Sequence, residues 1–361
     1  MSNQWQWLFL EPVDVWFFRD NKPFTAAQNF VARSLFPPSP QTVLGALRTA
    51  FLEQIGVNWA EFGQGNVQTE VGTPTDLNGF AVQAPFVARY KNGTVERFFR
   101  APLDLMKNKE KPTDYRLLRP ADTFDWFTDS PFDGWRPLVF SGVEPDANYE
   151  ETSDWLSESQ FTAYLDGQEA LGQLSKSSSI FEREARVGLA LNRARRANER
   201  GYFYQAEFIR MAANCGLLAG VNKPLFAQQG VMDIGGESRG AYYYTVPEAP
   251  QPLQRHTQGR VRIILLTPAY FSRGWQPASE DWSPWVGKGG KLVSLAIGKP
   301  QPLSGWDVAG NQPRPLRNYL PAGSVFFFEE AQLTGKPFTE TPSGALDHGA
   351  MGFGMYASGT W

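Results

Sequence analysis

Cysteine and histidine are nearly absent from this chain of 361 residues, which has one cysteine and two histidines, His256 and His348. A single cysteine cannot form an internal disulfide framework, so nothing points to an oxidising compartment. Neither histidine stands in a His-x-Glu or His-Glu-x-x-His spacing, and structural zinc sites are built mainly from Cys and His. The sequence therefore predicts no metal site.

Long apolar runs and common catalytic motifs are also missing. No stretch reaches the roughly 18 apolar residues expected of a membrane span, and residues 1–30 lack the features of a secretory signal. Neither a Gly-x-x-x-x-Gly-Lys-Ser/Thr phosphate loop nor a Gly-x-Ser-x-Gly elbow occurs. We expect a cytoplasmic protein without membrane contact, without a cofactor and without catalytic residues.

Aromatic residues, glycine and proline are plentiful by contrast. Aromatics make up 14% of the chain, which also holds 34 glycines and 27 prolines. Aromatic residues favour strands, and frequent Gly and Pro interrupt short elements. The composition predicts a strand-rich chain with long loops, and the length suits two domains of ordinary size.

One helix is predicted directly after the proline-rich segment 36–40. Ser39 is a good N-cap, and Pro40 suits the first helical position. Gln41, Gly45 and Arg48 share one face of this helix. The opposite, buried side is expected to carry Val43, Leu47, Ala50 and Phe51.

The remaining chain is divided by its pattern of apolar and breaking residues. Residues 58–79 are polar and Gly-rich and are predicted as loop. Residues 80–180 hold short apolar pieces broken by Pro, Gly and acids, and we interpret them as a long, partly mobile insertion. Residues 247–258 are rich in Pro and Gln and predict a linker. Strands are expected at 5–10, 202–211, 261–266 and 325–329.

The charge is unevenly distributed, although the net charge is only −3. Residues 122–169 contain twelve acids and one basic residue, whereas residues 183–200 contain six arginines and two acids. Residues 255–324 contain nine basic residues and three acids. An anionic ligand responds to local potential, so basic surfaces can bind phosphate on a chain that is acidic in total.

Three basic segments have features that suit a phosphate ligand, and each also has a plain structural alternative. Residues 19–48 join cations to a helix start, whose free amides favour anions, but the serine could only cap the helix. The arginines of 183–200 match phosphate oxygens, but they could form a solvated helix face. The glycines of 235–240 permit close approach of a ligand, but they could form a tight turn beside core tyrosines.

Four motifs stand in order along nearly the whole chain, and together they resemble one known family. The motifs are Val15-Trp-Phe-Phe-Arg-Asp-Asn-Lys-Pro-Phe24 with Leu35-Phe-Pro-Pro-Ser-Pro-Gln-Thr-Val-Leu-Gly-Ala-Leu-Arg48, then Glu184-Ala-Arg-Val-Gly-Leu189 with Arg200-Gly-Tyr-Phe-Tyr204, then Gly235-Gly-Glu-Ser-Arg239, and last Pro315-Leu-Arg317 with Pro321-Ala-Gly-Ser-Val325. They resemble the RAMP-superfamily subunit of the type III-B CRISPR (Cmr) effector complex that caps the five-prime tag of the guide RNA (crRNA).

The resemblance implies an α+β fold of tandem ferredoxin-like, RRM-related RAMP domains with long loop insertions. The first domain would span 1–250, with a large insertion at about 58–180, and the second 258–361. It implies a non-catalytic subunit that grips the five-prime tag of the crRNA in antiviral defence. It further implies docking to the large polymerase-like subunit and to the repeating backbone RAMP subunit.

The mechanism expected from the motifs is a grip on the sugar–phosphate backbone of the tag, with aromatic rings stacking its bases. Phosphate contacts would supply salt-dependent affinity, and base contacts would supply preference for the tag. The candidate RNA-binding residues are Arg19, Lys22, Arg33, Ser39, Gln41, Thr42, Arg48, Arg183, Arg186, Arg193, Gly235, Gly236 and Arg239.

Two other functions stay open on the sequence. A metal-independent guide-RNA endoribonuclease of the same superfamily would need a general base near a cation, and His256 beside Arg255 is the candidate pair; a solvent-exposed linker histidine is the alternative. A strand-rich carbohydrate-binding protein is suggested by the 12 tryptophans. The acidic stretch 122–169 matches none of the motifs, so the sequence assigns it no role.

Overall fold

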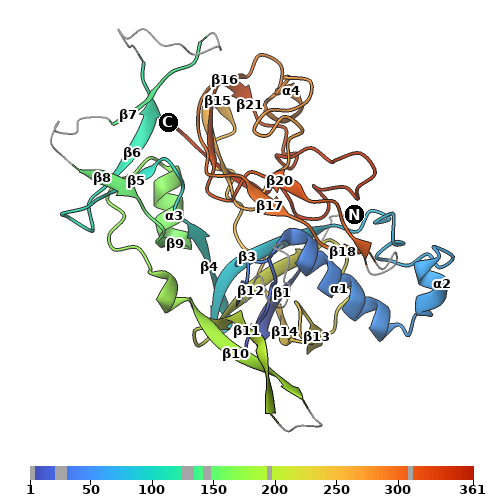
Figure 1. Cartoon of the computed structure of the whole chain (residues 1–361). Helices are drawn as coiled ribbons and strands as arrows, with labels where there is room; N and C mark the ends of the chain where they lie inside the picture. The colour runs from blue at the N-terminus through green and yellow to red at the C-terminus, as the bar shows by residue number, and fades with distance from the viewer. Residues whose placement is uncertain (1–4, 21–30, 123–133, 141–147, 193–196, 308–311) are drawn as a thin grey trace. The chain divides into compact units, whose positions relative to one another are not determined.

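The computed structural model describes residues 5–20, 31–122, 134–140, 148–192, 197–307 and 312–361 (Figure 1). The chain divides into two compact units. Unit 1 comprises Met1–Val95, Ser178–Ala249 and Pro302–Arg317, and unit 2 comprises Glu96–Ser177, Pro250–Gln301 and Asn318–Trp361. Strands predominate over helices, so the predicted α+β class is confirmed. The tandem ferredoxin-like arrangement and its domain boundaries stay predictions.

An antiparallel sheet forms the centre of unit 1, with the strand order β13-β14-β1-β12-β3. Its strands are β1 (Gln6–Pro12), β3 (Val82–Lys91), β12 (Cys215–Val221), β13 (Gln229–Asp233) and β14 (Gly240–Val246). Strand β12 is buried along its whole length, and Trp7, Leu8, Phe9 and Leu10 of β1 are buried beside it. The apolar opening of the sequence therefore forms a central strand, as predicted.

Helix α1 (Pro40–Gln54) packs against β3 and β13 of this sheet. It begins where the sequence predicts, because the Ser39 hydroxyl accepts a hydrogen bond from the backbone N–H of Thr42 at 3.2 Å. Val43 and Leu47 are fully buried, and burying such a side chain contributes about 1.5–3 kcal/mol. The apolar stripe thus fixes which face of α1 lies on the sheet and which face stays open.

Residues 58–180 contain more regular structure than predicted. They hold α2 (Trp59–Gly63), β4 (Thr94–Arg100), β5 (Leu105–Asn108), β6 (Tyr115–Pro120), β7 (Leu138–Phe140), β8 (Tyr149–Glu151), β9 (Trp155–Ser157), α3 (Glu158–Leu165) and a 3-10 helix (Ser177–Ser179). The loop predicted at 58–79 is interrupted by α2, and the short apolar pieces of 80–180 form strands and the helix α3; the interpretation of 80–180 as an insertion stays a prediction. Strands β4 to β9 have three to seven residues each, which is too short for a periodic pattern to stand out between Pro and Gly.

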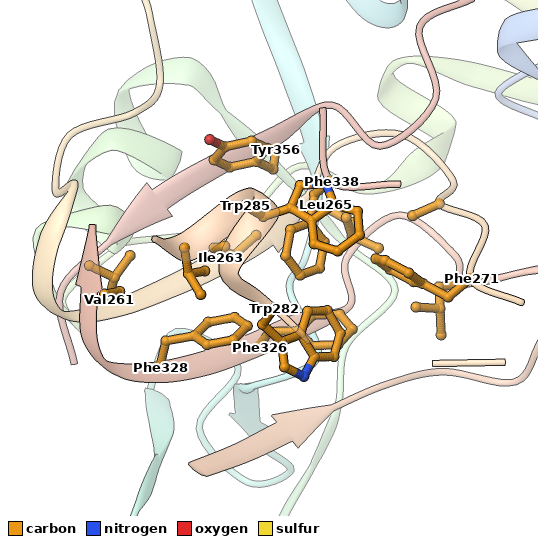
Figure 2. Packing of buried hydrophobic residues seen from close by; sticks show 14 residues of the cluster. Val261, Ile263, Leu265, Phe271, Trp282, Trp285, Phe326, Phe328, Phe338 and Tyr356 are labelled. Carbon is orange, nitrogen blue, oxygen red and sulfur yellow. The ribbon is translucent and has the colours of Figure 1, made fainter. Parts of the chain in front are cut away.

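Unit 2 is built around a second antiparallel sheet, with the order β16-β21-β15-β22. The strands are β15 (Gln258–Leu265), β16 (Lys291–Ala296), β21 (Val325–Gln332) and β22 (Tyr356–Gly359), and the short helix α4 (Ser283–Val286) follows β15 along the chain. A cluster of aromatic rings packs on this sheet (Figure 2). Trp282 and Phe338 stack within it, with ring centroids 5.5 Å apart. Large aromatic side chains bury much area, so this cluster is a main source of stability for unit 2.

The arginine-rich segment of unit 1 forms a ribbon of two long antiparallel strands, β10 (Phe181–Asn192) and β11 (Ala197–Met211) (Figure 1). Strand β2 (Val31–Ala32) runs parallel to β11 at its edge. The remaining short strands are β17 (Gln301–Leu303), β18 (Trp306–Asp307), β19 (Gln312–Pro313) and β20 (Arg317–Tyr319). Within the described ranges, no helix has the length and apolar character needed to span a membrane.

Candidate nucleic-acid interface

The candidate residues of the sequence fall into three groups, all within unit 1. Lys22 and Arg193 lie outside the described residues. The others gather around Ser34, around Phe208 of β11, and along helix α1, as the following contacts show.

The first group surrounds Ser34, which is buried. Arg19 pairs with Ser34 in an isolated antiparallel bridge, and Arg33 directly precedes it. Arg183 of β10 donates a hydrogen bond from Nη1 to the Ser34 carbonyl oxygen at 2.8 Å. The backbone of Arg19, the backbone of Arg33 and the side chain of Arg183 therefore all lie at Ser34, and Arg19 and Arg33 are exposed.

The second group covers the ring of Phe208. The guanidinium carbon of Arg186 lies 5.0 Å from the ring centroid, and that of Arg239 lies 4.8 Å from it. The strand register explains the first contact, because Glu184 pairs with Phe208 and Arg186 pairs with Ala206 on the same face of the ribbon. Cation–π contacts of this kind contribute about 0.5–1 kcal/mol at exposed sites. The register thus brings Arg186 to Phe208, and the turn between β13 and β14 brings Arg239 to the same ring.

Carboxylates accept hydrogen bonds from part of this second group. Arg186 contacts Asp14 at 3.1 Å and Glu184 at 2.6 Å, and Arg210 contacts the same two carboxylates. Hydrogen bonds from Arg186 lower the pKa of Asp14, and hydrogen bonds from Arg210 lower the pKa of Glu184. Exposed ion pairs contribute only about 0–1 kcal/mol, so exchanging a carboxylate for a phosphate oxygen costs little.

The first two groups do not share one face of the ribbon. Residues three apart in a strand point to opposite faces, and the contacts agree. Arg183 reaches Glu207, whereas Arg186 lies over Phe208. Arg183 and Arg186 therefore point to opposite faces of the ribbon, because successive residues of a strand alternate between its two faces.

The paired glycines at 235 and 236 make a tight turn between β13 and β14. Gly235 has a φ of 88°, and an added Cβ would lie 2.6 Å from the Phe17 carbonyl oxygen. The Gly236 amide donates to that same oxygen at 2.8 Å. Glycine is needed here so that the chain's own backbone can approach closely, which is the structural alternative that the sequence left open. The turn also carries Arg239 to Phe208.

The third group lies on helix α1. Ser39 and Thr42 bond to each other at the helix start, with 3.0 Å between their hydroxyl oxygens. Arg48 donates from Nη2 to the Thr73 carbonyl oxygen at 2.5 Å. Burial lowers the pKa of Arg48 to about 10, and the charge of Arg314 acts in the same direction. Arg314 is not among the candidate residues predicted from the sequence, although it directly precedes the last family motif.

The histidine proposed for a rival nuclease lies in a surface ion pair of unit 2. Arg255 donates from Nε to Asp166 at 2.8 Å, and His256 Nε2 lies 3.9 Å from the same carboxylate oxygen. The second histidine, His348, is buried and its Nε2 lies 2.8 Å from the Tyr319 hydroxyl. Arg255, the cation beside His256, is therefore paired with Asp166 of the same unit.

Two solved structures contain a chain that is similar to this one. The chain is similar to one chain in a cryo-EM structure of the type III-B Cmr-beta bound to cognate target RNA and AMPPnP, state 1; the identity is 15%, the TM-score is 0.50, and the match covers 89% of this chain and 86% of that one. A second structure, of the type III-B Cmr-beta bound to cognate target RNA, matches with 15% identity, the same coverages and a TM-score of 0.48. At this identity the first likeness shows the fold alone.

Sequence comparison decides the family. No curated protein matches the chain. The family model described as CRISPR-associated protein (Cas_Cmr3) matches residues 8–361, which is nearly the whole chain. This match confirms the resemblance carried by the four motifs, and the chain belongs to the Cas_Cmr3 family of CRISPR-associated proteins.

Proposed function

We propose that this chain is a non-catalytic RNA-binding subunit of a type III-B Cmr effector complex, and that it holds the five-prime tag of the crRNA in antiviral defence. Membership of the Cas_Cmr3 family supports the proposal. The observation that carries it is the meeting of Arg186 and Arg239 on the ring of Phe208, which combines two phosphate-binding forks with an aromatic side chain.

The binding mode follows from the chemistry of this group. Guanidinium forks bind phosphate oxygens and give affinity that depends on salt. Exposed aromatic rings stack on unpaired bases. Phe208 itself is buried, whereas Tyr242 of β14, three residues after Arg239, is 43% exposed. Asp14 and Glu184 orient the guanidinium groups before RNA arrives, and they compete with phosphate for them.

Docking to the large polymerase-like subunit and to the repeating backbone subunit belongs to the same proposal. The fold likeness to a chain of Cmr-beta supports it. A tag-holding subunit would have to sit at the five-prime end of the guide, so its partners would be the subunits that meet that end.

The test is RNA binding by the full chain within the reconstituted complex, using labelled crRNA tag over a range of salt concentrations. The double variant Arg186→Ala/Arg239→Ala should bind more weakly, and its salt slope should fall by about 0.7 for each lost phosphate contact. The variant Asp14→Asn should bind more tightly by a few-fold, because it removes a competing carboxylate from Arg186.

The matched control is Arg273→Ala, an exposed arginine of unit 2 that pairs with Glu280. It removes one positive charge away from the proposed site and should leave the affinity and the salt slope unchanged. If the double variant binds tag RNA as the wild type does, with the same slope, this site does not hold the tag.

A further inference from the structure

Three residues of α1 form a strip beside the third chain segment of unit 1, Pro302–Arg317. Gln41, Gly45 and Arg48 are spaced by four and three residues, so they lie on one face of the helix. A Cβ added at Gly305 would clash with the Gln41 side-chain amide, so the backbone at Gly305 rests on the first turn of α1. A Cβ added at Gly45 would meet nothing within 4 Å, so the middle of the strip is open.

Arg314 is held at this strip by its own backbone. Its amide donates to the Gly305 carbonyl oxygen at 2.8 Å, and the Ser304 hydroxyl donates to the Arg314 carbonyl oxygen at 2.7 Å. Because Gly305 rests on Gln41, these two bonds position Arg314 near α1. Its charge is felt by Arg48, two turns further along the helix, whose pKa it helps to lower.

In the described part of the chain, Arg48 and Arg314 each have an unused hydrogen-bond donor and no carboxylate ion pair. Among the described residues neither Arg48 nor Arg314 forms an ion pair with a carboxylate, and the Nε–H of each is enclosed without an acceptor. Arg48 donates instead to a neutral carbonyl oxygen, that of Thr73. The charge of Asp76 acts on Arg48 in the opposite direction to that of Arg314 and offsets part of it. Two like charges with unused donors are still unfavourable in the free protein, and an anion would supply a further counter-charge and the missing acceptors.

We propose that Arg48 and Arg314 together bind one phosphate group of the guide-RNA backbone, over the open surface at Gly45. The inference rests on the proposed function, since it names a further site on the same RNA. Guanidinium forks match phosphate oxygens, and two of them can share one phosphate. The missing side chain at Gly45 leaves room for the sugar next to it.

The test compares Arg48→Ala, Arg314→Ala and the double variant, each in the reconstituted complex with labelled crRNA tag. Each single variant should weaken binding roughly tenfold and lower the salt slope by about 0.7. Because both arginines hold the same phosphate, the double variant should lose much less than the product of the two single losses. A methylphosphonate is then placed at each position of the tag in turn. At one position it should weaken binding by the wild-type complex. At that same position it should not weaken binding by Arg48→Ala or by Arg314→Ala any further.

A steric variant tests the same site independently, in case the arginine variants misfold. Gly45→Leu keeps α1 intact, because leucine favours helices and the Cβ meets open space, and it should weaken RNA binding without lowering the melting temperature. Arg273→Ala again serves as the control. Wild-type affinity for Arg48→Ala, Arg314→Ala and Gly45→Leu would refute the shared phosphate site.

The outcomes separate this inference from the proposed function. If the α1 variants bind normally while Arg186→Ala/Arg239→Ala binds weakly, the phosphate site is wrong and the tag-binding function stands. If the wild-type complex shows no preference for the tag and none of these variants changes its affinity, both are wrong.

Discussion

Arg262 and Asp104 form an ion pair in unit 2 whose side chains are both fully enclosed, with 3.0 Å between Nη1 and Oδ2. The Tyr164 hydroxyl donates to the other oxygen of Asp104 at 2.6 Å, and the guanidinium lies 4.0 Å from the Tyr164 ring centroid. Burial raises the pKa of Asp104, and the charge of Arg262 opposes that rise. This single contact joins α3, β15 and the segment before β5, so unit 2 depends on it.

Replacing Arg262 with methionine should lower the free energy of unfolding by about 3–5 kcal/mol, because it leaves a buried carboxylate without its counter-charge. Without Arg262 the pKa of Asp104 rises further. A folded-state pKa above the unfolded value favours folding at low pH, and this contribution is lost as the pH rises through the folded pKa. The deficit in the free energy of unfolding should therefore be larger at pH 8 than at pH 5, as measured by denaturant unfolding at both values.

The double variant Arg262→Met/Asp104→Asn should recover much of the loss. A deficit independent of pH would contradict this account.

The arginines of unit 1 show why residue type alone does not identify a binding residue. Arg183 and Arg186 look equivalent in the sequence, yet one bonds to a backbone oxygen and the other lies over a ring on the opposite face of the ribbon. Arg314 was missed because nothing near it in the sequence signals that its backbone rests beside α1. The distinction comes from strand register and from contacts between distant segments.

At the scale of elements, α1 was predictable because its determinants are local. A serine cap, a proline in the first turn and an apolar stripe all lie within sixteen consecutive residues. Strands β1, β11, β15 and β21 were found, in part, from alternation or apolar runs. Strands β4 to β9 were missed because their pairing partners, and not their own patterns, define them.

Two glycines of unit 1 should respond in opposite ways to the same substitution. Gly235→Ala should lower the free energy of unfolding by about 1–3 kcal/mol, because alanine is strained at a φ of 88° and its Cβ would press on the Phe17 carbonyl. Gly45→Ala should raise it by about 0.5–1 kcal/mol, because alanine favours the helix and its Cβ meets open space. Chemical denaturation of the two variants is the measurement. Equal effects of the same sign would show that these glycines do not have the different structural roles assigned here.

At the scale of the whole molecule, the two units differ in charge. Unit 1 carries 17 basic and 15 acidic residues, a net charge of +2, whereas unit 2 carries 17 basic and 22 acidic residues, a net charge of −5. The net charge of −3 therefore describes neither unit. A nucleic acid is attracted by the first and repelled by the second.

Crosslinking of crRNA within the complex should consequently map to unit 1. Ultraviolet crosslinking followed by mass spectrometry should recover peptides from 31–48, 181–192, 235–242 and 312–317, and few from the acidic residues 134–169. Raising the salt should weaken the crosslinks of unit 1 in parallel with the affinity. Crosslinks concentrated in unit 2 would contradict the assignment of the RNA-binding surface.

The sequence by itself determined the family, the start of α1, several strands and the presence of basic segments in an acidic chain, because motifs, caps and composition are properties of neighbouring residues. Only the tertiary structure decided which arginines meet. Strand register separates Arg183 from Arg186, a tight turn carries Arg239 to Phe208, and the backbone at Gly305 brings Arg314 to α1. Such contacts join residues far apart along the chain, and they depend on the pairing and packing of whole elements, which no local pattern contains.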